Sequence, residues 1–107
     1  MEYRKLGRTD IEVSALCLGS MTWGTQNTED EGHSQIERAI EAGINFIDTA
    51  EMYPVNPVRA ETVGVTEAII GNWFEKTGRR DELILATKHS GAGSHSRDGA
   101  PITAKSI

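Results

Sequence analysis

The sequence predicts an α/β fold with a parallel sheet, because three short apolar runs alternate with two segments of helical character. The runs are Ala15–Leu18, Ile44–Ile47 and Leu83–Ala86. Each is nearly continuous in apolar residues, which is typical of strands buried on both faces of a parallel sheet. The predicted order is a hairpin, followed by strand, helix, strand, helix and strand.

A small β-hairpin is predicted to precede the sheet. Tyr3–Leu6 and Ile11–Val13 are short strand-like segments, and the four residues between them, Gly7-Arg8-Thr9-Asp10, have the composition of a turn. We therefore expect the hairpin within residues 1–14 and the β/α units within residues 15–107, all in one domain.

Two helices are predicted between the strands. The first spans about Glu29–Ala42, where Thr28 and Glu31 have the spacing of a capping box and Gly43 is a stop signal. The second spans roughly Thr62–Thr77. Its apolar stripe at helical spacing consists of Ile69, Ile70, Trp73 and Phe74.

The composition excludes several classes of protein. The 107 residues carry a net charge of -5 without a basic stripe, which speaks against a nucleic-acid partner. No apolar run approaches the roughly 20 residues of a membrane-spanning helix, and the N-terminus leads into no apolar signal core. The single cysteine, Cys17, cannot form an internal disulfide, and its place in a strand predicts an inert core thiol. These features predict a cytoplasmic protein.

Polar side chains follow the ends of the predicted strands, where function gathers in parallel α/β folds. Asp48 follows the second strand, Tyr53 comes five residues later, and Lys88 follows the third strand. A free tyrosine is a poor acid at neutral pH, because its pKa is near 10, but a nearby ammonium lowers that pKa. A carboxylate can hold the lysine. A phenol in this setting can protonate a carbonyl oxygen, and a nicotinamide cofactor would supply the hydride.

Four stretches make the sequence familiar: Tyr3–Thr9, Leu18–Gly24, Gly43–Tyr53 and Ala86–Lys88. Through them the chain resembles the N-terminal part of the aldo-keto reductase family, particularly its Tas-like bacterial branch. The resemblance implies a (β/α)8 TIM barrel whose bottom is closed by the hairpin. Three strands and two helices would make this chain an incomplete barrel. It also implies an oxidoreductase that reduces aldehydes and ketones with NADPH.

The resemblance also implies roles for individual residues. Asp48, Tyr53 and Lys88 match the family's catalytic positions, with Tyr53 as the acid, while the family's histidine follows a fourth strand. The residues expected to border the cofactor are Ser20, Met21, Gln26 and Asp48, and those expected to contact the substrate are Trp23 and Tyr53. Many members carry Gly after the tyrosine, whereas this chain carries Pro54, so the carbonyl substrate stays open. The 107 residues alone are expected to be inactive.

Other interpretations compete with this one. The chain can instead be a non-catalytic module that pairs through open sheet edges. A small nucleotide-binding domain is disfavoured, because no glycine fingerprint follows the first strand. Trp23 can be a packing residue, and His89 and His95 lie in a Gly- and Ser-rich loop without further ligands, so no metal site is expected. Neither a membrane nor a nucleic acid is an expected partner, and the oligomeric state is not predicted.

Overall fold

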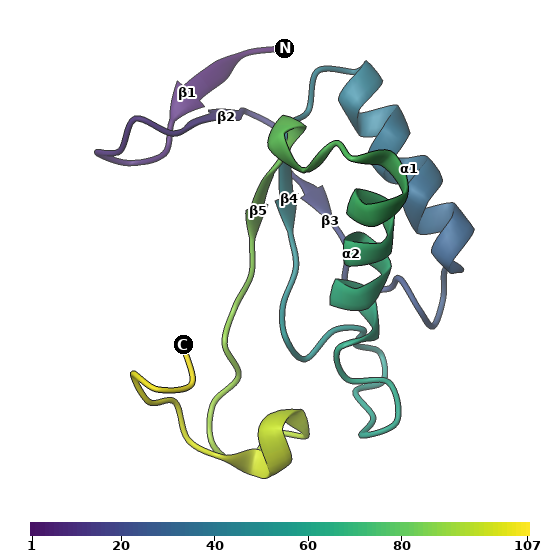
Figure 1. The fold of residues 1–107 in the computed structure, drawn as a ribbon, viewed down its shortest axis with the longest axis vertical. Coiled ribbons are helices and arrows are strands. Elements are labelled where there is room, and N and C mark those ends of the chain that lie inside the picture. The colour runs from purple at the N-terminus through teal and green to yellow at the C-terminus, as the bar shows by residue number, and fades with distance from the viewer.

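The computed structural model describes residues 1–107 and contains the predicted alternation of strands and helices (Figure 1). Two short 3-10 helices, η1 and η2, add to the expected elements. In chain order the elements are β1 (Tyr3–Lys5), β2 (Glu12–Ser14), β3 (Leu18–Gly19), α1 (Glu29–Glu41), β4 (Phe46–Asp48), α2 (Val65–Thr77), η1 (Arg80–Glu82), β5 (Ile84–Ala86) and η2 (Ser96–Gly99).

The predicted parallel sheet is confirmed. Its order is β3-β4-β5, with Leu18 opposite Ile47 and Phe46 opposite Ile84. Both helices lie on the same side of this sheet, as Figure 1 shows, and the loops that follow the three strands lie together at one end. Strands β3 and β5 are its outer strands, so pairing through those edges stays a prediction. No helix combines the length and apolar character that a membrane crossing requires.

The hairpin is confirmed as a separate two-stranded sheet. Strands β1 and β2 pair antiparallel, and Asn45 ties them to the start of β4. The amide of Ser14 donates to Asn45 Oδ1 at 2.7 Å, and the amide of Asn45 donates to Ser14 Oγ at 3.1 Å. The Tyr3 hydroxyl donates to the carbonyl of Gly43 at 2.6 Å. The hairpin is thus fixed at the end of the sheet opposite the loops that follow β3, β4 and β5.

Helix α1 begins as predicted and α2 begins later than predicted. The capping box is present, since the Glu31 amide donates to Thr28 Oγ1 at 3.1 Å and the Thr28 amide to Glu31 Oε1 at 2.9 Å. Helix α2 starts at Val65 rather than Thr62. The physical reason is Gly64, whose φ of 87° is incompatible with a right-handed helix and places the preceding residues in turns.

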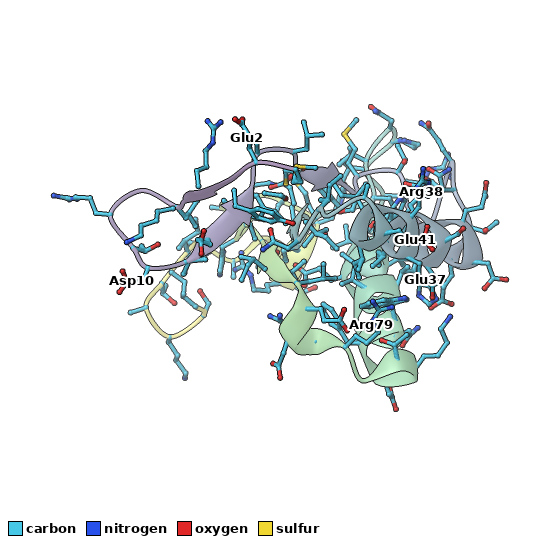
Figure 2. All side chains as sticks on the ribbon, turned by 90° about the horizontal axis from the view of Figure 1, so that it is seen from above. Glu2, Asp10, Glu37, Arg38, Glu41 and Arg79 are labelled. Atoms are coloured by element: carbon cyan, nitrogen blue, oxygen red, sulfur yellow. The ribbon has the colours of Figure 1, made fainter.

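The core lies between the two helices and the sheet. Its buried members are Trp23, Ile36, Ile47, Ile69, Ile70, Trp73 and Leu83. The charged residues lie outside this layer: in Figure 2, Glu37, Arg38 and Glu41 project from α1 and Arg79 from the turn after α2. The hydrophobic core therefore rests on the helix side of the sheet.

The environment of Cys17 differs from the one that the sequence predicts. The sequence predicts a core thiol, but Cys17 is exposed. Cys17 lies outside β3, which begins at the next residue, Leu18, and Leu18 is the residue that packs against the core. Partial burial and the nearby charge of Asp48 raise the pKa of its thiol.

Candidate active site

The ends of β4 and β5 bring Asp48 and Lys88 to one edge of the sheet. Asp48 is the last residue of β4 and lies opposite Ala86 of β5. Backbone pairing continues past both strands, since the Thr49 amide donates to the Ala86 carbonyl at 2.8 Å and the Glu51 amide to the Lys88 carbonyl at 3.0 Å. Lys88 is therefore held in register beside the end of β4. We call the part of the sheet edge that carries Asp48, Tyr53 and Lys88 the rim.

The ammonium of Lys88 uses its three donors on this rim. Lys88 Nζ donates to Asp48 Oδ1 at 2.9 Å, to Asp48 Oδ2 at 2.8 Å and to the carbonyl of Thr49 at 2.7 Å. Loss of solvent lowers the pKa of Lys88, but the interactions with Asp48 and Tyr53 outweigh that effect and hold the pKa above its usual value. Lys88 is thus a fixed positive charge at neutral pH.

Tyr53 lies beside the same ammonium. Lys88 Nζ is 4.9 Å from the centroid of the Tyr53 ring, within the range of a cation–π contact. The loop that carries Tyr53 is anchored at the start of α2, because the Tyr53 carbonyl accepts the amides of Gly64 at 3.1 Å and Thr66 at 3.4 Å. The structure therefore brings together the three residues that the sequence singled out as catalytic candidates.

The residues expected at the cofactor take different positions. Ser20 is buried, and its hydroxyl donates to the Asp48 carbonyl at 2.7 Å, so it supports the β4 end from behind. Met21 is exposed. Gln26 is also exposed, and its amide reaches the Asn56 carbonyl at 3.5 Å. Only Met21, Gln26 and Asp48 of this set are open to a ligand.

Trp23 corrects a further expectation. The sequence places it at the substrate mouth, but only 1% of its surface is exposed and it belongs to the core on the helix side. Its indole nitrogen donates to Gln35 Oε1 at 3.1 Å, and a Cβ built on Gly32 would stand 3.1 Å from its ring. Glycine at position 32 lets α1 approach the indole this closely. Trp23 is therefore a packing residue, the alternative that the sequence left open.

A shallow groove of about 470 Å³ adjoins Lys88. Met52 and the glycine-rich loop at residues 91–94 line it, whereas Asp48 and Tyr53 do not. The groove therefore touches the rim only at Lys88.

Sequence reasoning missed two residues next to this rim. Glu51 and Arg97 form an ion pair, with Arg97 Nε donating to Glu51 Oε1 at 2.6 Å. Glu51 lies inside Gly43–Tyr53, one of the stretches that carry the family resemblance, and its position there could have marked it as a candidate site residue. Arg97 lies in η2, within a segment rich in Gly and Ser, and nothing in its local sequence indicates a partner 46 residues away.

Comparison with known proteins shows which family this chain resembles. The model of the aldo/keto reductase family matches residues 15–105. The chain is 48% identical over 99 residues to Protein tas of Escherichia coli (strain K12), covering 92% of this chain and 28% of that protein. It is 44% identical over 89 residues to an uncharacterized oxidoreductase, YrpG, of Bacillus subtilis, covering 82% of this chain and 26% of that protein. The chain thus spans less than a third of the length of these relatives.

Solved structures agree with the sequence relatives. A holo form of an aldo-keto reductase from Bacillus halodurans superposes with a TM-score of 0.70 at 33% identity, covering 92% of this chain and 29% of that one. A thermostable aldo-keto reductase in complex with the inhibitor epalrestat superposes with a TM-score of 0.60, also at 33% identity, covering 83% of this chain and 31% of that one. The fold is an incomplete barrel of this type, and the chain belongs to the aldo-keto reductase family of oxidoreductases.

Proposed function

We propose that this chain supplies the catalytic rim of an NADPH-dependent reductase that converts aldehydes and ketones to alcohols. The contact of Lys88 Nζ with both oxygens of Asp48, beside the ring of Tyr53, carries the proposal. A phenol beside an ammonium that a carboxylate holds in place can protonate a carbonyl oxygen. The family, established over residues 15–105, supports the same chemistry.

Each of the three residues has a distinct role in this proposal. Tyr53 donates its phenolic proton to the substrate oxygen as negative charge develops there. Lys88 stabilises the negative charge left on the phenol oxygen, because its ammonium is already fixed beside the ring. Asp48 orients Lys88 through two hydrogen bonds. The rim therefore delivers one proton without having to rearrange.

The rim supplies a proton but no electrons, so a hydride donor fits its chemistry. NADPH, when bound, supplies that hydride. Met21 and Gln26 would border the cofactor, because both are exposed. Asp48 would border the cofactor through its carboxylate. Ser20 is buried and supports the end of β4 from behind, because its hydroxyl donates to the Asp48 carbonyl. The preference for NADPH over NADH is an expectation from the family.

The proposed substrate is a small carbonyl compound. Tyr53 is the one residue that we propose to contact it, since Trp23 is buried in the core. We also propose that the 107 residues are inactive alone, because the family's histidine follows a fourth strand and these residues contain three strands of the parallel sheet. The cytoplasmic location stays a prediction.

A chimera tests the proposal. Residues 1–107 replace the matched segment of the Bacillus halodurans reductase, and the unaltered reductase serves as the positive control. We expect the chimera to oxidise NADPH when small aldehydes or ketones are added, and the 107 residues alone to leave NADPH unchanged. A folded chimera that binds NADPH and reduces no carbonyl would contradict the proposed role of the rim.

A further inference from the structure

An ion pair that the proposed chemistry does not use lies next to Lys88. Arg97 Nε donates to Glu51 Oε1 at 2.6 Å, and a second nitrogen of the guanidinium lies 3.4 Å from Glu51 Oε2. The two side chains are three-quarters buried, with exposed fractions of 24% for Arg97 and 25% for Glu51. We call this pair the rim clamp.

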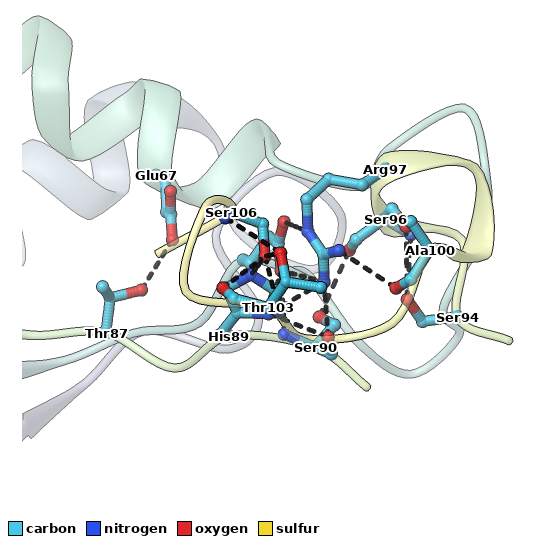
Figure 3. Close-up of polar contacts among 11 residues, drawn as sticks. Glu67, Thr87, His89, Ser90, Ser94, Ser96, Arg97, Ala100, Thr103 and Ser106 are labelled. Carbon is cyan, nitrogen blue, oxygen red and sulfur yellow. Dashed lines mark hydrogen bonds and ion pairs between the residues drawn. The ribbon is translucent and has the colours of Figure 1, made fainter. Parts of the chain in front are cut away.

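The rim clamp forms hydrogen bonds with the two residues that follow Lys88. The Ser90 amide donates to Glu51 Oε2 at 2.8 Å, while the Arg97 guanidinium donates to the Ser90 carbonyl and, at 2.8 Å, to His89 Nδ1. Figure 3 shows the Arg97 side chain reaching His89, Ser90 and the Ala100 carbonyl. The clamp therefore binds both the amide and the carbonyl of Ser90.

The backbone of Glu51 is hydrogen-bonded to Lys88 itself. The Glu51 amide donates to the Lys88 carbonyl at 3.0 Å, and the Glu51 carboxylate accepts the amide of Ser90, two residues further along the chain. Glu51 follows Asp48 by three residues on the same strand end. One residue thus joins the segment that carries the Asp48 carboxylate to the segment that carries the Lys88 ammonium.

From this arrangement we propose that Glu51 and Arg97 are positioning residues, which hold the Lys88–Ser90 backbone so that the Lys88 ammonium stays on the Asp48 carboxylate. The proposal deepens the proposed function, because it concerns the same rim. It assigns neither residue a contact with substrate or cofactor. The rim clamp acts on the reaction only through the placement of Lys88.

Two properties of the clamp support this role. The hydrogen bond from Arg97, followed by the one from the Ser90 amide, lowers the pKa of Glu51 to about 2, so the carboxylate is charged at any ordinary pH. Arg97 and its neighbour Asp98 have φ of 51° and 54°, a left-handed conformation that is costly for residues other than glycine. The four groups that bind the guanidinium compensate this cost, which ties the conformation of the loop to the clamp.

The test measures the titration of the Lys88 ammonium by NMR in the 107-residue chain with isotope-labelled lysine. Arg97→Lys keeps the positive charge but cannot bridge Glu51, His89, Ser90 and Ala100 together. Arg79→Lys is the matched control, because Arg79 makes an equally short pair with Glu82, at 2.6 and 2.8 Å, before the start of β5, whereas Lys88 follows the end of that strand. We expect the pKa of Lys88 to fall by about 0.5 to 1 pH unit in Arg97→Lys and to stay unchanged in Arg79→Lys.

A second variant separates position from charge. Arg97→Gln removes a cation and leaves the Glu51 carboxylate unpaired, so Coulomb effects alone would raise the pKa of Lys88. Loss of position would lower it, because Lys88 would leave the Asp48 carboxylate. We expect a fall in this variant as well. An unchanged or raised pKa of Lys88 in both Arg97 variants would overturn the proposal, even if the loop at residues 89–100 changes its own signals.

Loss of folding is covered by a third variant. If Arg97→Lys unfolds the chain, Glu51→Asp takes its place, since it keeps the charge and shortens the reach of the carboxylate by one methylene group. A lower pKa of Lys88 in folded Glu51→Asp would support the proposal, whereas unfolding of both variants would contradict it by making the clamp a general stabiliser. The readout needs no catalysis. It therefore fails or succeeds independently of the chimera assay.

Discussion

Tyr53→Phe is expected to reduce the turnover number of the chimera by about 10²- to 10⁴-fold, because it removes the proposed proton donor. Binding of NADPH is expected to stay unchanged, since the phenylalanine ring keeps its place beside Lys88. The measurement is NADPH oxidation at saturating aldehyde, together with a fluorescence titration of the cofactor.

Tyr3 offers a matched control for this prediction. The chain has two tyrosines, and the hydroxyl of Tyr3 donates to the Gly43 carbonyl at the opposite end of the sheet. Tyr3→Phe therefore removes the same atom away from the rim, and we expect near-normal turnover. Equal losses in both variants would indicate a general effect on folding, and full activity in Tyr53→Phe would exclude Tyr53 as the acid.

Ile36→Ala is expected to lower the free energy of unfolding by about 2 to 5 kcal/mol, because it leaves a cavity in the core. Ile36 is fully buried among residues of both helices and the sheet. A loss of this size is a large share of the total stability of a small domain. We expect much of the Ile36→Ala chain to be unfolded at 25 °C.

The measurement is urea unfolding followed by tryptophan fluorescence, since Trp23 and Trp73 are both buried in the core. Ile102→Ala is the matched control, because Ile102 is 50% exposed and the same atoms are removed. We expect that control to change stability by no more than about 0.5 kcal/mol. Similar losses in the two variants would show that the core does not lie between the helices and β4.

Local patterns predicted most of the fold. The capping box at Thr28 marked the start of α1, and the three apolar runs marked the parallel strands in the correct order. These features depend on residues close together in the sequence, which is why they can be recognised there. The start of α2 was predicted three residues early, because the left-handed conformation of Gly64 is a backbone property that helical periodicity does not reveal.

The site was predicted in part. Asp48, Tyr53 and Lys88 could be grouped because parallel strands place their carboxyl ends along one edge. The burial of Trp23 and the exposure of Cys17 could not be predicted, because both depend on how the segments flanking β3 pack against the rest of the chain, and local sequence does not reveal that packing. Arg97 was missed because its contact with Glu51 joins residues 46 positions apart through side chains alone.

In the proposed mechanism, Asp48 and Lys88 act as one unit on the proton donor. A double-mutant cycle in the chimera tests it most directly, with turnover measured for Asp48→Asn, Lys88→Met and the double variant. Residues that act as a unit give non-additive losses, so the double variant is predicted to lose no more activity than the poorer single variant. Losses that multiply in the double variant would contradict the claim and assign the two residues independent roles.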